Sequence, residues 1–270
     1  MKCTDLSRRQ LLTRAGVLGA VAVGGMVPLL AAAGGSPQAA SDVPTSSDID
    51  ILNFLLNLKY LQAEFYTKAT TGLTLAEVGV PISGVGDAGS TTGGQAVQLT
   101  FADDPRDIAV QIARDEQRHV RVLRTLLGAN AIAKPEINLD ALGLVSSLKL
   151  FMWRARQLED LGLSAYDGVA SLFESKSALG AAIRIALVEG QHTGYMRFFA
   201  FITGFGSPII DSHDVLPPTS GSKFFSDDNL SLAVVRTPSE VLAFLYHNNA
   251  SGTMSGGYFP QGVNGTINTV

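Results

Sequence analysis

The chain has 270 residues, enough to bury a sizeable hydrophobic core as one large domain or two small ones. Apolar residues make up 46% of it and charged residues 16%, a composition that excludes an intrinsically disordered protein. The net charge of −4 argues against nucleic acid or an anionic membrane as the main partner.

Residues 1–33 have the features of an export signal. Residues 7–12 (SRRQLL) resemble the twin-arginine motif, and an apolar run ending in small residues follows. Pro28 and several glycines interrupt that run, so an uncleaved anchor is the weaker alternative and membrane contact is expected only in transit. Because the segment holds four basic residues, one acidic residue and the sole cysteine, its removal would leave a net charge of −7 and no disulfide. We therefore expect an exported protein, periplasmic or extracellular.

Residues 34–47 are rich in Gly, Ser, Pro and Ala and predict a linker. A strongly apolar helix is expected from about residue 48 to residue 70. Glu64 is the only acidic residue of this helix beyond its first turn, and apolar side chains surround it. We therefore expect Glu64 to point inward.

Residues 71–102 show no clear periodicity and predict a long loop, in which residues 95–101 are a candidate short strand. Asp104 and Pro105 then form a strong start signal for a second helix, because aspartate caps helix N-termini and proline suits the first helical turn. Gly128 predicts its end.

A third helix is expected from about residue 140, with Glu159 at the centre of an apolar stripe. Ser175 or Ser177 is expected to cap a fourth helix that ends near residue 203. Four long helices in residues 48–203 predict a four-helix bundle. Residues 204–270 predict a loop-rich extension with one short helix, opened by a capping box at Thr237.

Two Glu-x-x-His motifs lie on the second and fourth helices, Glu116 with His119 and Glu189 with His192. Residues three apart share one face of a helix, so each pair can direct a carboxylate and an imidazole to the same point. Both pairs fall on apolar faces, where an unpaired carboxylate would cost several kcal/mol or take up a proton. The alternatives are two buried Glu–His hydrogen bonds or a metal site.

Together with Glu64 and Glu159, the two motifs match a di-metal pattern of helical bundles, in which two helices each give one Glu and two others each give a Glu-x-x-His. Four carboxylates would be neutralised by two divalent ions. Oxygen and imidazole donors suit iron or manganese, and a mature chain without thiolate argues against a structural zinc site. We therefore predict two iron or manganese ions as cofactors.

The chain resembles bacterial ferritin-like proteins related to plant desiccation-associated proteins. The resemblance implies an all-α, ferritin-like four-helix bundle in which Glu116 and Glu189 bridge the metals, while Glu64 with His119 and Glu159 with His192 are terminal ligands. It rests on seven segments: residues 61–66, 115–120, 158–159, 165–168, 189–192, 236–238 and 257–260.

The leading functional hypothesis is an exported di-metal oxidoreductase acting on oxygen, peroxide or ferrous iron. The alternative is a non-catalytic, stress-protective or structural bundle in which the metal is structural or absent. The expected partners are metal ions with oxygen or peroxide. His213 and His247 lie in the polar extension, where surface or capping roles are expected.

Overall fold

The computed structural model describes residues 43–99 and 105–270, and four long helices dominate them. The predicted all-α bundle is confirmed. The expected export signal, most of the linker and the Asp104 cap lie outside the described residues. The elements are α2 (Ser46–Thr71), β1 (Thr91–Thr92), α3 (Pro105–Leu127), a 3₁₀ turn η1 (Gly128–Asn130), β2 (Ile137–Asn138), α4 (Leu148–Ala170), α5 (Lys176–Thr203) and α6 (Pro238–Leu245).

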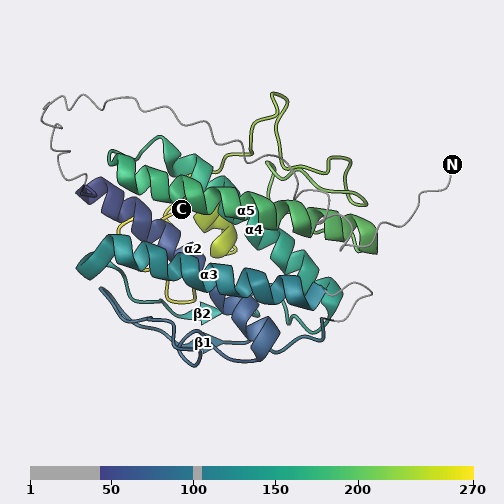
Figure 1. Cartoon of the computed structure of the whole chain (residues 1–270), viewed down its shortest axis with the longest axis horizontal. Helices are drawn as coiled ribbons and strands as arrows, with labels where there is room; N and C mark the ends of the chain where they lie inside the picture. The colour runs from purple at the N-terminus through teal and green to yellow at the C-terminus, as the bar shows by residue number, and fades with distance from the viewer. Residues whose placement is uncertain (1–42, 100–104) are drawn as a thin grey trace, which may run out of the picture. The chain divides into compact units, whose positions relative to one another are not determined.

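The four long helices pack as two pairs, α2 with α3 and α4 with α5 (Figure 1). The pairs meet where α2 contacts α4 and α3 contacts α5, and α6 packs against α4. Across residues 43–99 and 105–270, no helix has both the length and the apolarity to span a bilayer.

Helix α2 is the most deeply enclosed of the four, with 19 of its 26 residues buried. Thr45 and Asp48 form a capping box at its start, and Asp48 also accepts a hydrogen bond from the Glu174 backbone N–H at 2.9 Å. Gly72 ends the helix with a φ of 78°, a left-handed conformation that glycine adopts without strain. Because every face of α2 is buried, the hydrophobic pattern does not indicate which face points to the bundle centre.

Two sequence expectations are corrected in the loops. The strand lies at Thr91–Thr92, pairing in parallel with Ile137–Asn138, and residues 95–99 form none. The third helix begins at Leu148 rather than near residue 140. Asp140 instead accepts a hydrogen bond from the Gly94 backbone N–H at 3.1 Å, so this part of the chain joins the long loop.

The predicted caps of the last two helices are confirmed. Ser175 caps α5 by accepting a hydrogen bond from the Ala178 backbone N–H at 3.1 Å. Thr237 and Glu240 form the capping box of α6, and helix α6 ends at Leu245 with Tyr246 as its C-cap. These caps satisfy backbone donors that helix ends leave free.

Buried arginines fasten the C-terminal extension to the bundle. On α4, Arg156 pairs with Asp214 at 2.7 Å, and on α5 Arg197 donates to the carbonyls of Val215 and Lys223. Both arginines also contact Asp160, the neighbour of Glu159 in sequence. The extension is therefore an integral part of the fold.

A third buried arginine belongs to the extension itself. Arg236 donates to both carboxylate oxygens of Asp211, at 2.6 and 2.8 Å, and to Ser164 Oγ on α4 at 3.1 Å. Gly168 makes this close approach possible, because a Cβ there would lie 1.9 Å from the Arg236 carbonyl oxygen.

Near the C-terminus, Asn264 connects three distant parts of the chain. Its backbone carbonyl accepts a hydrogen bond from Asn57 Nδ2 of α2 at 2.8 Å. Its side-chain amide donates to the carbonyls of Asp87 at 2.8 Å and Ala133 at 2.9 Å. The loops before and after α3 are thereby joined to the first helix.

Candidate metal centre

Helices α3, α4 and α5 bring five of the six predicted ligand side chains to the bundle interior. Glu116 and His119 come from α3, Glu159 from α4, and Glu189 and His192 from α5. The three carboxylates are fully buried, and the two histidines are each 7% exposed. The inward direction predicted for both Glu-x-x-His motifs is what the structure shows.

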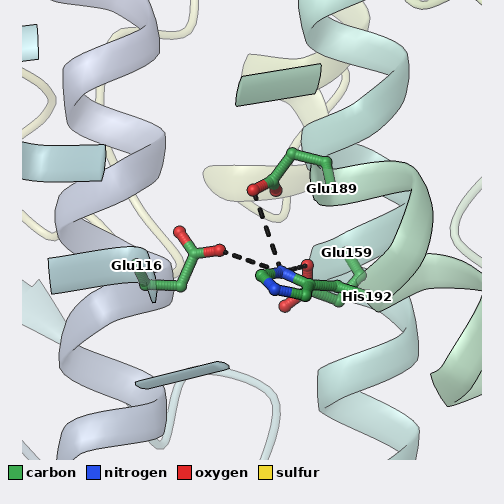
Figure 2. Close-up of side chains that lie close together, drawn as sticks. All are labelled: Glu116, Glu159, Glu189 and His192. Carbon is green, nitrogen blue, oxygen red and sulfur yellow. Dashed lines mark ion pairs between the residues drawn. The ribbon is translucent and has the colours of Figure 1, made fainter. Parts of the chain in front are cut away.

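The donor atoms of four of these side chains, Glu116, Glu159, Glu189 and His192, converge on one point (Figure 2). His192 Nδ1 lies 3.4 Å from Glu116 Oε1, 3.4 Å from Glu159 Oε2 and 3.9 Å from Glu189 Oε1. One donor atom from each of these four residues lies within 4.8 Å of all the others. Such separations suit donors around one transition-metal ion with bonds of about 2.0–2.2 Å.

His119 lies at the edge of the same group. Its Nδ1 is 3.2 Å from Glu189 Oε1 and 3.6 Å from Glu116 Oε1. The two imidazole rings are 6.3 Å apart between centroids, so the histidines flank the carboxylates without stacking. His119 can thus add a donor to the group.

The converging atoms lack hydrogen-bond partners within the described part of the chain. They are Glu116 Oε1, both oxygens of Glu159, Glu189 Oε1, His119 Nδ1 and His192 Nδ1. Buried polar atoms are nearly always satisfied, so six unsatisfied atoms aimed at one point require a compensating group. A cation bound at this point would satisfy the converging atoms, and when no cation is bound, protonated histidines are close enough to pair with the carboxylates.

Glu64, the sixth predicted ligand, lies elsewhere. Its oxygens accept hydrogen bonds from the Leu75 backbone N–H at 3.0 Å and from Thr91 Oγ1 at 2.8 Å. Lys134 Nζ is 3.8 Å away and balances its charge. Burial raises the pKa of Glu64, opposed by the Thr91 hydrogen bond and by Lys134. The structure therefore gives Glu64 a role in tethering the long loop and does not bring it to the cluster.

Lys59 reaches the cluster from α2 instead. Its Nζ lies 3.0 Å from Glu116 Oε2 and 2.5 Å from Glu189 Oε2, and the side chain is fully buried. Burial works to lower the pKa of Lys59, but the two carboxylates outweigh it and raise that pKa. Sequence reasoning did not single out Lys59, although a lysine in the middle of so apolar a helix was a signal.

Comparison with known proteins agrees with this arrangement. Residues 47–200 match the model of the ferritin-like domain family. The chain belongs to that family. The ferritin-like catalase Nec2 of Nesocodon mauritianus is 24% identical over 82% of this chain and 85% of its own length. The metal-type donor cluster thus lies inside a ferritin-like domain.

Burial and neighbouring charges shift the pKa values of two residues in this ferritin-like site, Glu159 and His192. Burial, with the neighbouring charges of Glu189 and Glu116, raises the pKa of Glu159 to about 7, although His192 opposes the shift. Burial disfavours the imidazolium of His192, but the carboxylates of Glu116 and Glu159 outweigh it and raise the pKa of that ring to about 11. Since metal ligands must be deprotonated, ion binding at this site is coupled to proton release.

Two further residues support the ferritin-like site. Asp115 Oδ2 lies 3.7 Å from His192 Nε2, on the side of the ring away from the carboxylates. Gln62 Nε2 donates to Glu189 Oε2 at 3.2 Å and to the Leu158 carbonyl at 3.1 Å. Gly162 leaves room for Gln62, because a Cβ there would lie 2.8 Å from its amide nitrogen. Such outer contacts hold ligands in place.

Proposed function

We propose that this ferritin-like protein is a metal-dependent oxidoreductase that uses iron or manganese to act on peroxide or oxygen. The observation that carries the proposal is the group of unsatisfied carboxylate and imidazole atoms converging in the bundle interior. A purely structural bundle has no need of three buried carboxylates directed at one point, because the single Lys59 ammonium beside them cannot balance all three and buried uncompensated charge is costly.

The exposure of the site supports a small substrate. Glu116, Glu159 and Glu189 are inaccessible, whereas the side chains of His119 and His192 are 10% and 8% exposed. So small an exposed surface suits a substrate as small as peroxide or oxygen. The name of the Nesocodon relative, a ferritin-like catalase, supports peroxide in particular.

Five side chains of this protein are placed to bind the metal ion. Glu159 and His192, with the Oε1 atoms of Glu116 and Glu189, would hold the ion, and His119 is placed to complete the set. A bound iron or manganese ion supplies redox chemistry at open coordination positions. The surrounding helices exclude bulk water, which strengthens every charge interaction within the site.

We expect the metal-loaded protein to consume hydrogen peroxide with release of oxygen. The protein is loaded anaerobically with Fe(II) or Mn(II), desalted, and followed by peroxide absorbance and by an oxygen electrode. The control is the same protein treated with a chelator, which is expected to be inactive. A fully loaded protein that turns over neither peroxide nor oxygen would favour the alternative, a stress-protective bundle with a structural metal.

We also propose export through the twin-arginine route, because Arg8 and Arg9 precede the apolar run. Residues 1–40 fused to a reporter are expected to direct translocation, and changing Arg8 and Arg9 together to lysine is expected to stop it. Cell fractionation measures both. Undiminished translocation of the double-lysine fusion would contradict this route. A protein folded before crossing could carry its metal with it.

A further inference from the structure

The two oxygens of Glu116 and of Glu189 face different partners. In each residue Oε1 is directed to the histidines and lacks a hydrogen-bond donor among the described residues, whereas Oε2 contacts Lys59 Nζ. A carboxylate that bridges two metal ions likewise gives one oxygen to each ion. Lys59 Nζ therefore lies on the side of both carboxylates that a second ion would need.

We infer that Lys59 takes the place of one metal ion, so that the site holds a single divalent cation beside a fixed ammonium group. The ion is bound on the Oε1 side, by Glu159 and His192 with Glu116 and Glu189. This inference rests on the proposed metal site and states how many ions the site holds. It replaces the two ions expected from the sequence pattern.

Charge balance supports a single ion. The cluster contains three buried carboxylates, Glu116, Glu159 and Glu189, which one ammonium and one divalent cation neutralise. A second divalent ion would leave an excess of positive charge in a buried site, where uncompensated charge is expensive. The fourth carboxylate of the expected di-metal set, Glu64, is balanced separately by Lys134.

The lack of space beside Glu116 and Glu189 also supports a single ion. Ions of two-metal sites lie about 3.5–4 Å apart and share their bridging ligands. Lys59 Nζ already lies within 3.0 Å of the two shared ligands, and its side chain is enclosed, with the Tyr166 ring centroid 5.5 Å from Nζ. A second ion would have to displace the ammonium from both carboxylates.

The test is metal stoichiometry, which does not depend on turnover. The full chain is loaded anaerobically with excess Mn(II), desalted and analysed by elemental analysis and electron paramagnetic resonance. We expect one ion per chain, with the hyperfine pattern of isolated Mn(II). Lys59→Glu removes the ammonium and adds a carboxylate, so it is expected to bind two ions. Lys149→Glu makes the same charge change on the exposed face of α4 and is expected to stay at one.

The outcomes separate this inference from the proposed function. Two ions in the wild-type protein, or one in a folded Lys59→Glu variant, would overturn the inference and leave the metal-dependent function standing. No bound metal in any variant would overturn the function itself. If Lys59→Glu does not fold, anomalous diffraction from the loaded wild-type protein decides. One peak beside Glu159 and His192 supports the inference, and a second peak near Lys59 overturns it.

Discussion

Replacing Glu159 by glutamine is expected to weaken metal binding by at least about 100-fold. Loss of groups that merely orient a ligand already costs about 10–100-fold in affinity, and Glu159 is itself a donor. Both of its oxygens are buried and lack hydrogen-bond partners within the described residues, and its ion pair is with His192, itself a proposed ligand of the ion. Titration with Mn(II), followed by calorimetry, measures the change.

The fold is expected to survive this substitution. Burial raises the pKa of Glu159 to about 7, so a neutral side chain is well tolerated there when no metal is present. Glu159 also makes no ion pair with Lys59, unlike Glu116 and Glu189, so the variant leaves no ammonium stranded. The metal-free variant should therefore match the metal-free wild type in circular dichroism and melting temperature.

Glu64→Gln is the matched control. It makes the same chemical change at another buried glutamate, but Glu64 contacts Leu75, Thr91 and Lys134 instead of the cluster. Its metal affinity is expected to equal that of the wild type. A large loss of affinity in Glu64→Gln, with none in Glu159→Gln, would show that the ligand set read from the structure is incorrect.

Asp211→Asn is expected to lower the free energy of unfolding by about 2–3 kcal/mol. Removing one partner of a fully buried ion pair typically costs about 3–5 kcal/mol, and the Asp211 side chain is 25% exposed, which reduces the effect. The substitution leaves the buried Arg236 guanidinium without a countercharge at residue 211, where one amide oxygen replaces the two carboxylate oxygens that accept from it. Urea unfolding in the presence of a chelator measures the loss without a contribution from metal.

The effect should depend on pH. Burial acts to raise the pKa of Asp211, but the Arg236 hydrogen bonds and charge outweigh it and hold that pKa below its usual value. The pair therefore stabilises the fold above the ordinary pKa of aspartate, and this contribution is lost as pH falls through the lower, folded value. The difference between wild type and variant should be widest near neutral pH and should narrow in acid.

Asp167→Asn on the exposed side of α4 serves as control for Asp211→Asn. Surface substitutions away from special contacts usually change stability by no more than about 0.5 kcal/mol. Equal losses in the two variants, or a gap that widens in acid, would contradict the role given to the Arg236–Asp211 pair.

The sequence predicts helix ends correctly where the capping residue and its backbone partner are close neighbours in the chain. Ser175 and Thr237 cap their helices as expected, because a side-chain oxygen at an N-terminus satisfies free backbone donors regardless of the rest of the fold. The start of α4 was misplaced because residues 140–147 are held by tertiary contacts. The Asp140 carboxylate bonds to the Gly94 backbone, and no pattern within residues 140–147 encodes that partner.

The inward direction of the ligand side chains could be predicted on a helix with one apolar face, but not on a helix that is buried on all sides. Helix α3 has a clear apolar face, so the inward direction of Glu116 and His119 follows from the sequence. Helix α2 is enclosed on all sides, and its hydrophobic pattern does not choose between Lys59 and Glu64. These two residues are five positions apart, so their side chains point about 140° away from each other around the helix axis. The general ligand pattern calls for a carboxylate on this helix, and it therefore led to the choice of Glu64.

The hydrogen bonds of Asn264 have a consequence for biosynthesis. The residues that this amide group and carbonyl join, Asn57, Asp87 and Ala133, are translated long before it, so these three hydrogen bonds can form only when synthesis is nearly complete. A nascent chain stalled before residue 264 would lack this connection between α2 and the two loops, even with all four long helices already made.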